Sequence, residues 1–160
     1  MKISIRTAKK EDASSMLALI KELALFEKDP EAVEVNVKDL ERDGFGENPL
    51  FHCFVAEVDN KIVGMALCYP RYSTWKGKTI HLEDLIVNND YRGHKIGGKL
   101  LDEVVSYGHA NGVRRIEWAV LDWNEPAIAF YEKKGARVLR DWDVVQLDEK
   151  GIENYISKLS

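Results

Sequence analysis

The chain has 160 residues, of which 45% are apolar and 31% are charged, with a formal net charge of −4 at pH 7. These values fit one folded domain over residues 1–160 and exclude a disordered chain. The acidic balance argues against nucleic acid and anionic membranes as partners, and no apolar run approaches the ~20 residues that span a bilayer.

The N-terminal half predicts strands and helices in alternation. Residues Ile3–Ile5 alternate like a strand, and apolar residues recur at helical spacing from Met16 to Phe26. Lys28-Asp29-Pro30 should end that helix, and a shorter helix is expected around Asp39-Leu40. Two strand-like runs, 51–58 and 61–69, flank Asp59-Asn60, which is typical of a two-residue hairpin turn.

The C-terminal half continues the alternation. The expected order is a strand at 79–87, a helix at 96–107 ended by Asn111-Gly112, a strand at 115–120, a short helix from Asn124 to Gly135, a hairpin made of 137–139 and 144–147, and a helix at 152–159. This order predicts an α/β (α+β) domain on a mixed sheet.

The two cysteines and four histidines do not indicate a metal site. Cys53 and Cys68 lie in strand-like runs without CxxC spacing, which favours buried free thiols over a disulfide or a metal pair. The histidines lack ligand spacing, so we expect no metal. The N-terminus has no apolar signal segment, so a cytoplasmic location is the default.

The most informative stretch runs from Val87 to Gly98. It joins a strand to a helix through a loop with basic residues and glycines. Amides at a helix N-terminus attract anions, and glycine lets a phosphate approach the backbone. The stretch therefore predicts a phosphate-bearing ligand, although a tight turn alone would also use these glycines.

A second segment, Asn124-x-x-Ala127-x-x-Phe130-Tyr131-x-x-x-Gly135, follows the next strand. With the glycine loop it resembles the GCN5-related N-acetyltransferases. That resemblance implies a mostly antiparallel central sheet flanked by helices, and acetyl-CoA as the acetyl donor. The residues it implies for the cofactor are Leu85, Ile86, Val87, Arg92, Gly93, His94, Lys95, Ile96, Gly97, Gly98, Asn124, Glu125, Pro126, Ala127, Tyr131 and Lys134.

The likeness extends over nearly the whole chain to the diamine acetyltransferases. It is carried by 21–24, 43–46, 52–53, 82–84 and 123–126. Residues 72–77 and 120–124 look most like the thialysine-acetylating members. The branch implies a small primary amine as substrate and a homodimer as the assembly. Lys95 departs from the family loop, which has a small residue there, so we expect an ordinary φ at Lys95. Its ammonium either supplements the phosphate contacts or faces water, which we favour.

Acyl transfer to an amine needs a neutral nucleophile, while an alkylammonium has a pKa near ~10.4. Glu83, in the strand before the loop, is the candidate base, although a carboxylate that only solvates the strand is the alternative. Strand alternation places neighbouring Asp84 on the opposite face unless a bulge intervenes. Tyr131 is the candidate acid for the departing thiolate, and a packed aromatic is its alternative. The resemblance assigns the oxyanion to the N–H of Leu85.

The amine side is expected to use Phe26, Glu27, Ser73, Trp75, Glu83 and Asp84. Glu27 matches a substrate-binding carboxylate of the branch, whereas the nearby acidic residues fit a solvated loop. Trp75 could stack on an alkylammonium or cover the core. In polyamine-acetylating members an aspartate occupies the position of Ser73, so this chain should disfavour long polyamines.

We therefore expect a cytoplasmic N-acetyltransferase that transfers acetyl directly to a small primary amine, since neither cysteine lies in a nucleophile frame. The alternatives are an acetyltransferase of protein N-termini or antibiotic amines, and a non-catalytic acyl-CoA-binding regulatory module. The presence of Glu83 and Tyr131 argues against the regulatory module.

Overall fold

The computed structural model describes residues 1–159. The chain divides into two compact units, the first ending at Ala119 and the second beginning at Val120. Across the described residues, no helix has the length and apolar character needed to cross a membrane.

The first unit is built on a five-stranded sheet in the order β1-β2-β3-β4-β5. Its strands are β1 (Ile3–Thr7), β2 (His52–Val58), β3 (Lys61–Ser73), β4 (Gly77–Val87) and β5 (Ile116–Glu117). The first three pairings are antiparallel and the β4–β5 pairing is parallel, which confirms the predicted mixed, mostly antiparallel sheet.

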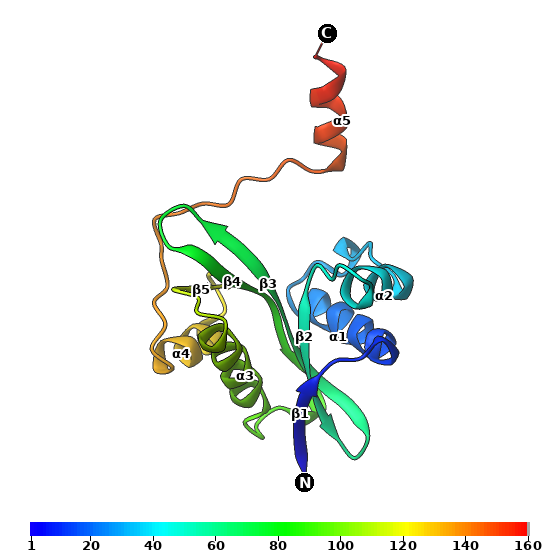
Figure 1. The fold of residues 1–160 in the computed structure, drawn as a ribbon, viewed down its shortest axis with the longest axis vertical. Helices are drawn as coiled ribbons and strands as arrows, with labels where there is room; N and C mark the ends of the chain where they lie inside the picture. Colours follow the sequence, from blue (N-terminus) through cyan, green and yellow to red (C-terminus); the bar gives the residue numbers. More distant parts are fainter. Residues whose placement is uncertain (160) are drawn as a thin grey trace. The chain divides into compact units, whose positions relative to one another are not determined.

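Helices cover both faces of this sheet. They are α1 (Ala13–Phe26), α2 (Val37–Phe45) and α3 (Ile96–Ala110), with short 3-10 turns η1 (Lys10–Asp12), η2 (Pro30–Ala32) and η3 (Asn89–Tyr91). Figure 1 shows α1 and α2 on one side of the sheet and α3 on the other. Met16 and Leu19 of α1 join a buried cluster with residues of β2, β3 and β4.

Helix α3 lies close to β3 because β3 has a glycine at the crossing point. A Cβ placed on Gly64 would lie 3.2 Å from Leu100 Cδ1 and 3.5 Å from Ile96 Cγ2. Ile96, Leu100 and Val104 are all buried. The apolar face of α3 is thus fixed on the sheet, and this fixes the position of the loop that precedes the helix.

The predicted hairpin turn between β2 and β3 is confirmed. Asp59 and Asn60 have φ values of +49° and +63°, the left-handed pair that a two-residue turn of the I′ type requires. Short polar side chains tolerate this conformation better than other non-glycine residues.

Strand β5 is shorter than the sequence pattern predicts. It pairs with β4 only through Ile80↔Ile116 and His81↔Glu117, and it ends at Glu117. Strand β4 continues to Val87, still paired with β3 on its other side. No strand of the described chain pairs with β4 beyond His81 on the β5 side, so that edge of β4 is open.

The second unit contains α4 (Glu125–Lys133) and α5 (Glu149–Ser157). The Asn124 side chain accepts a hydrogen bond from the Ala127 N–H (3.3 Å), so the predicted N-cap is confirmed. The hairpin predicted at 137–147 is wrong for this chain, because the described residues have no strand after Glu117. That segment instead carries exposed apolar side chains, including Val144 and Val145.

Candidate active site

The loop between β4 and α3 is held by its own hydrogen bonds. The Asn88 side chain accepts from the Asp90 N–H (3.0 Å), and the Asn88 N–H donates to the Val63 carbonyl of β3 (2.7 Å). Arg92 Nε donates to the Val87 carbonyl (3.2 Å). These bonds tie both halves of the loop to the end of the sheet, so the loop has a defined shape before any ligand binds.

Lys95 differs from the sequence expectation. Its φ is +64°, in the left-handed region, so the expectation of an ordinary φ is wrong. Lys95 occupies the position where the family loop has a small residue, and the chain keeps the conformation that favours glycine there at a cost of about 1–2 kcal/mol. Gly93 is also left-handed, at +85°, and open space surrounds the position of its absent Cβ.

Helix α3 begins without a side-chain cap. Lys95 is the N-cap residue and makes no capping hydrogen bond, and the first turn contains no acidic residue. The helical bonding starts with the Lys99 N–H donating to the Lys95 carbonyl (3.2 Å). The amides of Ile96, Gly97 and Gly98 precede that bond, as expected for an anion site at a helix N-terminus. The buried Ile96 side chain belongs to the core, so only its backbone is suited to a ligand.

The open edge of β4 leads into this loop. In an antiparallel pair, alternate residues direct their N–H and C=O groups away from the partner strand. Between Leu82 and Val87, such groups point toward the edge of β4 along which β5 no longer pairs. An extended ligand with amide groups can therefore hydrogen-bond along β4 while its phosphates reach the start of α3.

Two carboxylates of β4, Glu83 and Asp84, interact with Glu27 at the end of α1. Burial raises the pKa of Asp84 to about 6, and the negative charges of Glu83 and Glu27 contribute to that rise. Partial burial also raises the pKa of Glu27, with a smaller contribution from Glu83. The neighbouring negative charges add to the effect of burial on Asp84 and Glu27, and an acidic group of this kind attracts a cation.

A register shift explains how Glu83 and Asp84 come to interact. Leu67 pairs with Asp84 while the next residue, Cys68, pairs with Leu82, so Glu83 is the extra residue of a bulge. The simple alternation that would separate the two carboxylates is therefore interrupted at this position. Bulges often re-aim side chains beside active sites, and this one falls on the candidate base.

Tyr69 is a residue that the sequence analysis missed. Its hydroxyl donates a hydrogen bond to Glu83 Oε1 (2.9 Å), and burial together with this bond raises the pKa of Tyr69. Its ring lies 5.3 Å from that of His81. The β3–β4 register would have revealed this contact, because Tyr69 pairs with His81 and Glu83 lies two residues further along β4. Tyr69 therefore orients the Glu83 carboxylate.

The proposed amine-binding residues fall into two groups. Phe26 and Glu27 lie at the C-terminal end of α1, and the charge of Glu27 contributes to the raised pKa of Asp84. Ser73 and Trp75 lie at the tip of the β3–β4 hairpin, where Trp75 is 80% exposed. About 20 Å of β4 separates Gly77, which pairs with Ser73, from Glu83. The hairpin tip and the carboxylates therefore do not lie together within this chain.

The hydroxyl of Ser73 has a structural role. Its Oγ accepts hydrogen bonds from the N–H groups of Trp75 and Lys76, both at 3.1 Å. Ser73 therefore closes the hairpin turn in the way that serine and aspartate commonly do. Trp75 does not cover the core, so the alternative interpretation of its ring is wrong.

The remaining predicted residues belong to the second unit. Tyr131 lies on α4, partly buried, with its ring 5.4 Å from that of Phe130 in an edge-to-face arrangement. Asn124 caps α4, and Glu125 and Pro126 form its first turn. Ala127 donates to the Asn124 cap, and Lys134 is the C-cap residue.

Both thiols are buried and poorly suited to act as nucleophiles. Both cysteines are free and buried, and burial raises the pKa of Cys68 to about 11 and that of Cys53 further still. Thiols so disfavoured as thiolates are poor nucleophiles. Among residues 1–159, no three His, Cys, Asp or Glu side chains form a group that could hold a metal ion.

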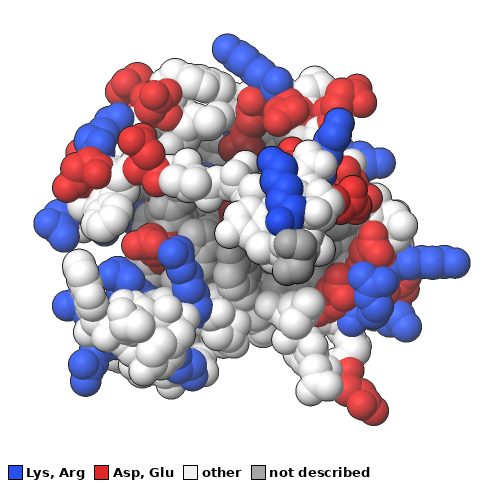
Figure 2. Space-filling view, turned by 90° about the horizontal axis from the view of Figure 1, so that it is seen from above, with Lys and Arg blue, Asp and Glu red and all other residues white. Residues whose placement is uncertain are grey.

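Charges of both signs are spread over the surface. Figure 2 shows acidic and basic side chains interspersed on the face that it displays, without a continuous field of one sign. Neither a basic stripe nor an acidic field is therefore present on this face.

Comparisons with known proteins agree with this geometry. Residues 15–136 match the acetyltransferase (GNAT) family. The chain is 42% identical over 147 residues to the thialysine N-epsilon-acetyltransferase of Sus scrofa, covering 87% of this chain and 86% of that protein. It is 38% identical over 139 residues to the human spermidine/spermine N(1)-acetyltransferase-like protein 1, covering 82% of this chain and 20% of that protein.

The fold is also found in solved structures. The integron cassette protein VCH_CASS6 of V. cholerae superposes with a TM-score of 0.80 at 21% identity, and 99% of each chain is covered. The chain belongs to the GNAT family and is an N-acetyltransferase. Members of this family use acetyl-CoA as the acetyl donor.

The raised pKa of Asp84 predicts a pH-dependent stability. Because the folded-state pKa (about 6) exceeds the unfolded value (about 3.9), the folded protein binds this proton more tightly and loses stability as pH rises through that window. Asp84→Asn should therefore raise the free energy of unfolding by roughly 1–3 kcal/mol at pH 7.5 and leave it unchanged at pH 4. Urea denaturation at both pH values measures this. The exposed Asp122→Asn is the control, and equal gains at both pH values would contradict the prediction.

Proposed function

We propose that this N-acetyltransferase transfers the acetyl group of acetyl-CoA directly to a small primary amine of the thialysine or diamine class. The observation that carries the proposal is the arrangement of strand β4. It offers an open edge and an uncapped helix start to a phosphate-bearing thioester, and coupled carboxylates to an amine. A module that only senses acyl-CoA would have no need of the carboxylates.

The donor side of the proposed site uses main chain. The pyrophosphate would lie on the amides from Gly93 to Gly98, with Arg92 adding a positive charge. The Leu85 N–H follows the bulge and would stabilise the negative charge that develops on the thioester oxygen. These residues fit acetyl-CoA, because their amides are placed by α3 and β4 and need no large rearrangement.

The acceptor side uses the carboxylates. Glu27, Glu83 and Asp84 would attract an ammonium group, and Glu83, oriented by Tyr69, would remove its proton directly or through water. Tyr131 would donate a proton to the departing thiolate. The inert thiols of Cys53 and Cys68 support direct transfer rather than an acyl-enzyme.

We propose that the whole chain works as one acetyltransferase domain in the cytoplasm. The family match crosses from the first unit into the second, which supports one functional domain. The two free thiols suit a reducing compartment.

Release of CoA with a panel of amines tests the reaction. We expect turnover with thialysine and short diamines, and Tyr131→Phe should lower kcat by about 10²-fold while leaving CoA affinity nearly unchanged. Tyr155→Phe, on α5, is the matched control. Glu83→Gln should lower the rate mainly at neutral pH, because the amine deprotonates itself at high pH. Binding of acetyl-CoA without turnover of any amine would favour the regulatory module.

The preference among amine substrates should depend on whether the residue at position 73 carries a charge. Asp can accept the same two turn hydrogen bonds, so Ser73→Asp adds a negative charge without opening the hairpin. A charge-assisted contact is worth about 1.5–3 kcal/mol, so this variant should shift kcat/KM toward spermidine over thialysine by roughly ten- to a hundredfold. Ser73→Asn preserves the turn without the charge and is the control. A wild-type preference for spermidine of tenfold or more would refute this role for Ser73.

A homodimer is the proposed assembly. The hairpin tip lies far from Glu83 of its own chain, so a partner's tip is better placed to complete the amine site. The exposed Val144 (80%) and Val145 (93%) supply apolar surface for an interface. Sedimentation at micromolar concentration should give about twice the 18.3 kDa mass of the chain. A species that stays at the single-chain mass throughout this range would rule out the dimer.

A further inference from the structure

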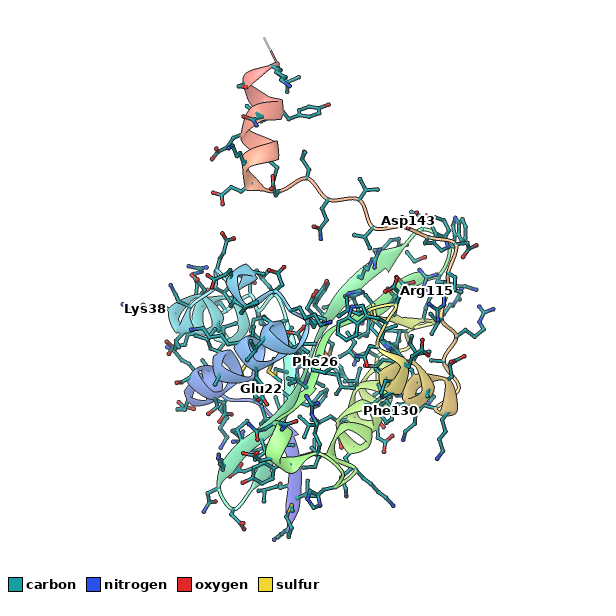
Figure 3. The ribbon with its side chains drawn as sticks, turned by 180° about the vertical axis from the view of Figure 1, so that it is seen from behind. Glu22, Phe26, Lys38, Arg115, Phe130 and Asp143 are labelled. Atoms are coloured by element: carbon teal, nitrogen blue, oxygen red, sulfur yellow. The ribbon has the colours of Figure 1, made fainter. Side chains whose placement is uncertain are left out.

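Two residues in the C-terminal half of α1 contact the loop that precedes α3. The Glu22 carboxylate accepts hydrogen bonds from Asn88 Nδ2 (3.1 Å) and from the Asn89 N–H (2.9 Å). One turn later, the Arg92 guanidinium lies over the Phe26 ring, with Arg92 Cζ 5.3 Å from the ring centroid. Figure 3 shows Glu22 and Phe26 on α1, on the side that faces the end of β4.

Glu22 binds the part of the loop that determines its shape. Asn88 already holds the loop through its bonds to Asp90 and Val63, and the Asn89 N–H begins the 3-10 turn η3. Each oxygen of the Glu22 carboxylate accepts one of the two donors, so both groups are satisfied by a single side chain on another element. The turn is thereby anchored to α1 as well as to β3.

Phe26 restrains the cation of the loop. Arg92 uses Nε on the Val87 carbonyl, and the planar guanidinium stacks on the ring. Because Nε is hydrogen-bonded and one face of the guanidinium lies on the ring, the other N–H groups of Arg92 have a defined direction before a ligand binds. Glu22 and Phe26 are four residues apart on one helix face, so they act on successive parts of the same loop.

We propose that Glu22 is a positioning residue for the acetyl donor. Glu22 holds the conformation of the loop that receives the pyrophosphate, and Phe26 assists by orienting Arg92. This proposal rests on the proposed function and adds a residue that does not touch either substrate. Simple electrostatics gives the opposite expectation, because removing a carboxylate near a phosphate site should improve anion binding. The sign of the effect therefore separates the two mechanisms.

The first experiment compares two acetyl donors. Acetyl-CoA carries the pyrophosphate, and S-acetylpantetheine carries the same thioester without it. We expect Glu22→Gln to lower kcat/KM for acetyl-CoA about tenfold, through KM, and to leave kcat/KM for S-acetylpantetheine within twofold of wild type. Lys21→Ala, an exposed neighbour on α1, should change neither value. An equal loss with both donors would show a merely structural role, and a gain with acetyl-CoA would show simple repulsion. Either result overturns the proposal.

A second variant tests the contact itself. In Glu22→Gln combined with Asn88→Asp, the new amide can donate to the new carboxylate, which still accepts from the Asp90 N–H. This double variant should recover at least half of the lost kcat/KM for acetyl-CoA, whereas Asn88→Asp alone should lose activity by repulsion from Glu22. Absence of recovery would refute the pairing of Glu22 with Asn88.

Phe26→Leu gives an independent measurement that leaves Glu22 intact. It should lower kcat/KM for acetyl-CoA about threefold in the wild-type background and have no further effect in Arg92→Ala. A full effect in Arg92→Ala would show that Phe26 does not act through Arg92. Equal use of both donors by the wild-type enzyme would instead refute the phosphate assignment of the loop, which is a failure of the proposed function.

Discussion

The separation of β5 from β4 after His81 is the constraint on which the rest of the structure depends. A sheet normally satisfies its backbone groups by pairing strands, and here one edge of β4 is left to hydrogen-bond with something else. The same strand leads into a loop bonded to Val63 and Val87 and then into a helix with an uncapped start. Helix α3 can hold that start in place because Gly64 lets it pack closely on the sheet.

The bulge at Glu83 places acidic groups next to that open edge. Without the extra residue, Asp84 would follow the alternation of the strand and lie apart from its neighbour. Burial of Asp84, together with the charges of Glu83 and Glu27, raises its pKa, so its proton is retained to a higher pH than usual. A carboxylate perturbed in this way costs folding stability and is characteristic of sites that bind or move charge. Strand β4 therefore presents polar backbone along one edge and a cluster of carboxylates at its middle.

The sequence predicted α1, α3 and the Asp59-Asn60 turn, because each depends on local periodicity or on residues with unusual φ preferences, whereas the mostly antiparallel sheet was expected from the family resemblance. It did not predict the bulge, because a register shift depends on the partner strand. The contacts of Tyr69 with Glu83 and of Glu22 with Asn88 were missed for the same reason, since they join residues 14 and 66 positions apart. The hairpin at 137–147 was wrongly predicted, because alternation signals a strand only where a neighbouring edge is present to pair with it.

The left-handed conformation of Lys95 affects the unfolded chain as well as the folded one. A lysine has fewer backbone conformations to lose than a glycine, so ordering this position during folding costs less entropy. The free-energy cost of the left-handed conformation is then part of folding and does not recur each time a ligand binds. A loop with lysine in this conformation has less backbone freedom than one with glycine, and a proposed anion site at the start of α3 would then have its amides aligned before binding.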